Sequence, residues 1–163
     1  MTTASEFVQR YGGIYEHSPW VAEEAAEDAA GSDNMQRVAE IMADCVDNAS
    51  TERQLALIRA HPDLAGKAQL AGELTQDSTE EQSSAGLDQC SAEEYAQFQS
   101  LNDRYHGKFG FPFVMAVKGS SRADIIAAFA QRLDHDTATE FETALQEIHK
   151  IAKLRLHALE VGE

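Results

Sequence analysis

Helical periodicity runs through most of this chain and limits what it can fold into. Apolar side chains recur three and four residues apart, which places them on one face of an α-helix. In the stretch 35–46 these positions are Met35, Val38, Ile41, Met42, Cys45 and Val46. The same pattern predicts helices over 20–30, 51–60, 91–105, 122–133 and 137–159. The chain is therefore expected to be helical nearly throughout.

Helix starts are marked by short polar side chains that accept hydrogen bonds from the first turn. Ser18 followed by Pro19 is typical of an N-cap and a first helical residue. Serine or threonine followed three residues later by glutamate is the capping-box signature. It occurs at Ser78–Glu81, Ser91–Glu94 and Thr137–Glu140. Each of these predicts a helix start.

One apolar segment, residues 109–117, does not fit a helix. Gly110 and Pro112 disfavour both a helix and a central strand there. We therefore expect a short, extended and buried segment between helices. Its backbone N–H and C=O groups need hydrogen-bond partners, for which a bound ligand, helix ends and water are the alternatives.

The composition argues against several classes of function. The net charge is −15, from 13 basic and 28 acidic residues, so nucleic-acid binding is not expected. Apolar runs stay well below the roughly eighteen residues that indicate a membrane span. Residues 1–11 have neither the basic start nor the apolar run of a signal peptide. Because Cys45 and Cys90 are too few for a disulfide framework, we expect a cytoplasmic protein that does not bind membranes.

His61 is conspicuous because Pro62 follows it. Proline disfavours the α conformation of the residue before it, so the helix over 51–60 should end there. The imidazole is then fixed by the backbone and able to face a cavity. Gly66 and Lys67 follow in the same short segment. This combination indicates a functional site more than a packing element.

Arg155 falls on the apolar face of the predicted last helix. That face is formed by Phe141, Leu145, Ile148, Ala152 and Leu159. An arginine in this position either packs its stem and sends its guanidinium to water or a structural carboxylate, or it points into a cavity and holds a substrate carboxylate. The pattern alone favours the structural interpretation.

Ser78 and Glu81 allow the same two interpretations. A capping box needs no substrate, and alone it is the better explanation. A helix start also presents N–H groups suited to an anion, with Glu81 and Gln82 adding an acceptor and an amide.

A metal site is not expected. The six histidines are His17, His61, His106, His135, His149 and His157. They show no metal-ligand spacing, and His157 lies opposite the apolar face of its helix. The glycine-containing turns match neither a phosphate-binding loop nor a nucleophile elbow.

Five stretches in this order resemble the OHCU decarboxylase family. They are Tyr11–Trp20, His61–Lys67, Gly72–Leu87, Leu101–Val114 and Ile151–Leu156. The resemblance covers almost the whole chain. It implies an all-α, single-domain bundle of about seven to nine helices over residues 1–163, with one short extended apolar segment. It also implies a homodimer and an enzyme without a cofactor.

The resemblance implies decarboxylation of 2-oxo-4-hydroxy-4-carboxy-5-ureidoimidazoline (OHCU) to (S)-allantoin and CO₂, the third step of urate degradation. The family's catalytic residues fall on His61, Glu81 and Arg155. Its substrate contacts fall on Pro62, Ser78, Thr79, Glu80, Glu81, Gln82, Phe113, Val114, Met115, Ala116 and Val117. The resemblance thus reverses the preference for purely structural roles at Glu81 and Arg155. Arg155→Leu is expected to preserve or raise stability while activity falls.

Two other functions stay open. An acidic all-α protein-interaction module without catalysis would show an exposed apolar patch. A family member acting on a different small ureido acid would differ in the segment 113–117. The sequence does not decide how His61 and Arg155 divide the proton transfers.

Overall fold

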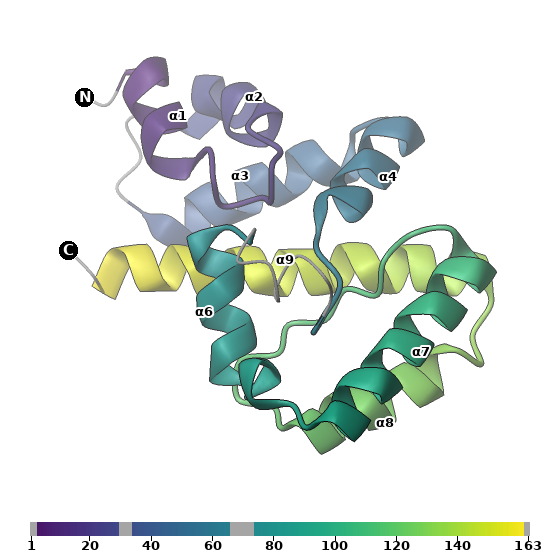
Figure 1. Cartoon of the computed structure of the whole chain (residues 1–163). Coiled ribbons are helices and arrows are strands. Elements are labelled where there is room, and N and C mark those ends of the chain that lie inside the picture. Colours follow the sequence, from purple (N-terminus) through teal and green to yellow (C-terminus); the bar gives the residue numbers. More distant parts are fainter. Residues whose placement is uncertain (1–2, 30–33, 66–73, 162–163) are drawn as a thin grey trace. The chain divides into compact units, whose positions relative to one another are not determined.

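The chain folds into helices joined by loops (Figure 1). The computed structural model describes residues 3–29, 34–65 and 74–161. The helices are α1 (Ala4–Tyr11), α2 (Trp20–Ala29), α3 (Met35–Asp47), α4 (Thr51–Ala60), α6 (Gln76–Ser84), the short 3₁₀ helix η1 (Leu87–Gln89), α7 (Ala92–Phe109), α8 (Arg122–Arg132) and α9 (Thr137–Val161). No strand occurs in these ranges, and the predicted all-α class is confirmed. In the same ranges, every helix is too short or too polar to cross a membrane.

Two compact units divide the chain. The first comprises residues 1–60 and 148–163, and the second comprises residues 61–147. The long helix α9 is continuous through the boundary and contributes to both. Each unit buries apolar side chains of its own.

In the first unit, α2 packs against α1 and α3. The helix α1 buries Phe7 and Tyr11, whose ring centroids lie 4.6 Å apart. The helix α3 buries Val38, Ile41, Met42 and Val46. These four are among the positions that the periodicity placed on one face. Burying side chains of this size contributes about 1.5–3 kcal/mol each.

In the second unit, aromatic side chains gather around Tyr105 of α7. Its ring centroid lies between 4.5 and 6.3 Å from those of Phe109, Phe111, Phe113 and Phe129. Phe113 and Phe129 also stack on each other, 3.7 Å apart. Residues 112–117 form neither helix nor strand, and Phe113 within them is fully buried. The predicted apolar segment between helices is thus confirmed for residues 112–117, whereas Phe109, where the prediction began, is the last residue of α7.

The capping residues agree with the sequence prediction at one of three sites. The box Ser91–Glu94 forms at the start of α7. The boxes predicted to begin at Ser78 and Thr137 are wrong, because each helix is capped earlier. Thr75 is the N-cap of α6 and its hydroxyl accepts the N–H of Ser78 at 3.2 Å. At α9, the carboxylate of Asp136 accepts a first-turn N–H at 2.7 Å.

Candidate active site

His61 lies where the sequence predicts, directly after the last residue of α4. The residue is 8% exposed, and Pro62 and Asp63 after it are half-buried. The imidazole is therefore carried by the loop 61–65 and not by a helix face. Gly66 and Lys67 of the same sequence motif lie outside the described residues.

Gln82 of α6 holds the loop that carries His61. Its Oε1 accepts the N–H of Ala65 at 3.0 Å, and its Nε2 donates to the carbonyl of Asp63 at 3.3 Å. Both ends of a buried amide are thus used on the backbone of this loop. Gln82 was predicted as a substrate contact, and the structure gives it a second task, which is to fix the loop.

Three polar side chains of α7 complete this support, and the sequence pattern did not single them out as site residues. They are Gln99, Asn102 and His106, three and four residues apart on one helix face. Gln99 donates to the carbonyl of Ala65 at 2.8 Å, and Asn102 donates to the carbonyl of Leu64 at 3.0 Å. Nε2 of His106 lies 2.7 Å from the carboxylate of Asp63. A polar stripe at helical spacing was the signal that could have found them.

Ala65 adopts a backbone conformation that favours glycine, with φ of 51°. Its N–H is bonded to Gln82 and its carbonyl to Gln99. Backbone strain of this kind persists where the surroundings over-determine it, as at functional sites. The loop after His61 is therefore held in one conformation from two helices.

Part of the predicted run Ser78–Gln82 lies on the buried face of α6. Ser78 and Gln82, four residues apart, are 4% and 3% exposed. Glu81 beside them is half-buried, whereas Thr79 and Glu80 lie on the exposed side. Because Thr75 caps the helix, Ser78 lies within the first turn and is not the helix start.

The segment Phe113–Val117 is buried except at Met115 and Ala116, which are half-buried. Two of its backbone groups are hydrogen-bonded to side chains. The partners expected from the sequence were a bound ligand, helix ends and water, and side chains were not among them. The carbonyl of Val114 accepts from Arg132, and the N–H of Ala116 donates to Glu147.

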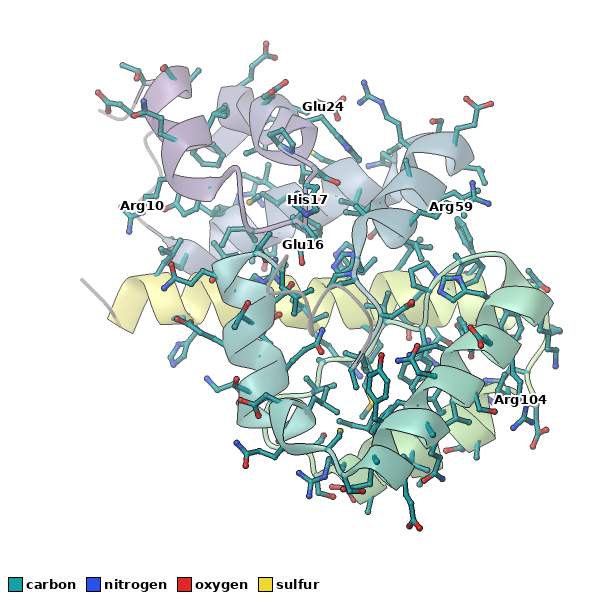
Figure 2. The ribbon with its side chains drawn as sticks, viewed as in Figure 1. Arg10, Glu16, His17, Glu24, Arg59 and Arg104 are labelled. Atoms are coloured by element: carbon teal, nitrogen blue, oxygen red, sulfur yellow. The ribbon has the colours of Figure 1, made fainter. Side chains whose placement is uncertain are left out.

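Arg155 lies on the buried face of α9 and is 5% exposed. Its Nη1 donates to the carbonyls of Gly13 and Ile14 at 3.4 and 3.3 Å. Its Nη2 lies 3.4 Å from a carboxylate oxygen of Glu16, which is 2% exposed. Figure 2 labels Glu16 in the loop that follows α1. The sequence analysis considered a structural carboxylate as one partner for the Arg155 guanidinium. Glu16 supplies that carboxylate, and the sequence pattern did not identify it.

Tyr15, next to Glu16, is also bonded to α9. Its hydroxyl lies 2.8 Å from Nδ1 of His149, and Nε2 of that imidazole lies 3.0 Å from the carboxylate of Asp47. Burial, with a smaller effect of the Asp47 charge, raises the pKa of the Tyr15 phenol above its usual range. The phenol therefore stays protonated at neutral pH. Two neighbouring residues of the loop after α1 are thus bonded to side chains of α9.

The residues that the sequence predicted for the active site are divided between the two units. His61, Glu81 and the segment 113–117 belong to the unit 61–147, and Arg155 belongs to the other unit. His61 and Glu81 supply an imidazole and a carboxylate within one unit, which are groups that transfer protons. Arg155 supplies a guanidinium in the other unit, a group that balances negative charge. Among the described residues, no group of three His, Cys, Asp or Glu side chains is arranged to hold a metal ion.

Comparisons with known proteins agree with the resemblance seen in the sequence. The profile of the family described as OHCU decarboxylase matches residues 1–157. The chain is 49% identical over 150 residues to the 2-oxo-4-hydroxy-4-carboxy-5-ureidoimidazoline decarboxylase of Haloferax volcanii, covering 92% of this chain and 86% of that protein.

Two solved structures share the fold. A crystal structure of (S)-allantoin synthase aligns with a TM-score of 0.77 at 32% identity, over 97% of this chain and 51% of that one. A crystal structure of OHCU decarboxylase in the presence of (S)-allantoin aligns with a TM-score of 0.74 at 24% identity, over 92% of this chain and 96% of that one. The family match and the identity to a full-length relative establish that this chain belongs to the OHCU decarboxylase family.

Proposed function

We propose that this chain converts OHCU to (S)-allantoin and CO₂, the third step of urate degradation, without a cofactor. The observation that carries this function is the 49% identity to a named OHCU decarboxylase over 86% of that protein's length. Membership of this family makes the chain a carboxy-lyase.

The substrate can lose CO₂ without an added electron sink. Its carboxylate is attached to a ring carbon that also bears a hydroxyl and adjoins a ring C=N bond. The electron pair of the breaking C–C bond moves toward this C=N, which takes the place of a pyridoxal or thiamine group. The hydroxyl then becomes a carbonyl, and one proton adds to one face of the neighbouring carbon. The protein must orient the substrate and manage these protons.

His61 acts as the general acid/base for the hydroxyl proton. An imidazole both gives and takes a proton near neutral pH. Its support is the loop 61–65, which is bonded to α6 and α7 at four backbone groups and one carboxylate. A base on such a loop keeps its direction during turnover, and this favours catalysis by orientation.

Glu81 accepts hydrogen bonds from the ring and ureido N–H groups and so selects the face that receives the proton. Pro62 and the run Ser78–Gln82 also contact the substrate. The segment Phe113–Val117 adds apolar contacts that exclude water. Arg155 offsets the negative charge of the substrate, and its bond to Glu16 keeps the guanidinium in one place.

The enzyme acts as a homodimer, as the family resemblance implies, and it works in the cytoplasm, as its few cysteines indicate. A mass measurement in solution tests the assembly against the chain mass of 17.9 kDa. Twice this mass supports the dimer, and the mass of one chain contradicts it.

The activity is tested with OHCU generated in situ from urate by the two upstream enzymes. Circular dichroism then follows the appearance of optically active allantoin. Faster loss of OHCU and an excess of the S form support the function. If added protein changes neither the decay nor the handedness of the product, the chain is not an OHCU decarboxylase, and a binding module or a different ureido acid substrate becomes the better explanation.

A further inference from the structure

Two side chains hold the backbone of the apolar segment on either side of Met115. Arg132 of α8 donates from Nη1 to the carbonyl oxygen of Val114 at 2.6 Å. Glu147 of α9 accepts the N–H of Ala116 at Oε1, 3.1 Å away. All of these residues belong to the unit 61–147.

These two bonds fix the directions of both polar groups of Met115. A trans peptide is planar, with its C=O and N–H on opposite sides. Since the carbonyl of Val114 points to Arg132, the N–H of Met115 in the same peptide points away from Arg132. Since the N–H of Ala116 points to Glu147, the carbonyl of Met115 points away from Glu147.

Arg132 is itself held rigidly. Its Nε lies 2.8 Å from a carboxylate oxygen of Glu140, a residue with no exposed surface. The hydroxyl of Tyr105 donates to the same oxygen at 2.6 Å. The guanidinium also lies 4.3 Å from the ring centroid of Phe113, at the start of the segment. A buried and charge-balanced arginine therefore sets the position of the Val114 carbonyl.

We infer that Arg132 and Glu147 are positioning residues for the substrate, an inference that rests on the proposed function. They set the directions of the N–H and C=O of Met115. This residue lies in the segment Phe113–Val117, which the proposed function assigns to substrate contact. A residue offering one donor and one acceptor fits an amide-like group, such as the ureido chain or the ring amide, that offers the complementary pair. Neither Arg132 nor Glu147 touches the substrate in this account.

Glu147 provides the cleaner test, because it is half-buried. Loss of Arg132 would leave the buried Glu140 without its arginine partner, although Tyr105 and His135 still bond its carboxylate, and the fold itself would suffer. Glu147→Leu removes the acceptor of the Ala116 N–H, whereas Glu147→Gln keeps an oxygen that can accept it. Glu142→Leu is the matched control, since Glu142 is exposed on the same helix.

Two measurements are made on the full-length protein. Amide hydrogen exchange at Ala116 reports the bond directly, and it should speed up in Glu147→Leu but not in the control. Steady-state kinetics should then show KM for OHCU raised about three- to tenfold in Glu147→Leu with kcat nearly unchanged. Glu147→Gln should recover most of the wild-type KM.

The inference is overturned if exchange at Ala116 does not change in Glu147→Leu. It is also overturned if exchange changes while KM stays at the wild-type value, or if Glu142→Leu raises KM as much. Failure of the proposed function is a separate result, because the wild-type protein would then leave the decay of OHCU unchanged.

Discussion

The guanidinium of Arg155 and the carboxylate of Glu16 form an ion pair inside the first unit, with 3.4 Å between Nη2 and the nearer oxygen. Both side chains are almost fully buried. This pair corrects an expectation drawn from the sequence, in which Arg155→Leu preserves or raises stability. That substitution leaves the charge of Glu16 buried without its Arg155 partner.

Arg155→Leu should therefore lower the free energy of unfolding by about 3–5 kcal/mol, as breaking a buried ion pair from one side does. Urea unfolding at neutral pH measures the loss. The double variant Arg155→Leu/Glu16→Leu should recover much of the stability, because neither charge of the pair is then buried without the other. A single variant as stable as the wild type would show that the pair contributes nothing to the fold.

The N-cap of α6 gives a second prediction. Thr75→Ala removes the hydroxyl that accepts the N–H of Ser78, so it should cost about 1 kcal/mol of stability. Exchange of the Ser78 amide proton should become faster. Ser78→Ala is the matched control, because the acceptor on Thr75 remains. Faster exchange of the Glu81 amide proton in Ser78→Ala, with no change at Ser78 in Thr75→Ala, would show that Ser78 and not Thr75 is the N-cap.

Alkaline pH should destabilise the protein through its buried tyrosines. Burial raises the pKa of Tyr15, and burial together with a hydrogen bond to Glu140 raises that of Tyr105. A raised folded-state pKa means that the stabilisation is complete below the ordinary phenol value of 10.0 and is lost as pH rises above it. Unfolding in urea at increasing pH measures the slope.

Tyr15→Phe should reduce this alkaline slope, because it removes one of the two phenols whose pKa is raised. Absorbance titration of the phenolates provides the control, since the variant should lose a late-titrating group. An unchanged slope, or a Tyr15 phenol that titrates like an exposed tyrosine, would contradict the burial argument.

The helix α6 consists of polar residues, so only its capping residues signalled it in the sequence. Periodicity predicted well the helices that bury an apolar face. Val38, Ile41 and Met42 on α3 are examples. Helix starts were less predictable, since Thr75 and Ser78 both suit an N-cap and the backbone geometry decides between them. His61 was found because Pro62 ends the helix locally.

The partners of the site residues could not be read from the sequence. Glu16 lies far along the chain from Arg155, and Glu147 lies far from Ala116, so only the fold brings each pair together. A single acidic residue carries no local signal of such a partner. The resemblance to a family supplied the candidate functional residues, whereas the structure shows the side chains that hold them.

The most direct test of the account compares the wild-type protein with His61→Ala and with His157→Ala, whose imidazole is exposed. Circular dichroism follows (S)-allantoin formed from OHCU made in situ, and far-ultraviolet spectra check that helicity is unchanged. We expect rapid formation of the S form by the wild type and by His157→Ala. For His61→Ala we expect the slow decay of OHCU that is seen without protein. Retained activity in His61→Ala would remove His61 from the mechanism, and a wild-type protein that neither speeds the decay of OHCU nor favours the S product would contradict the assignment as a whole.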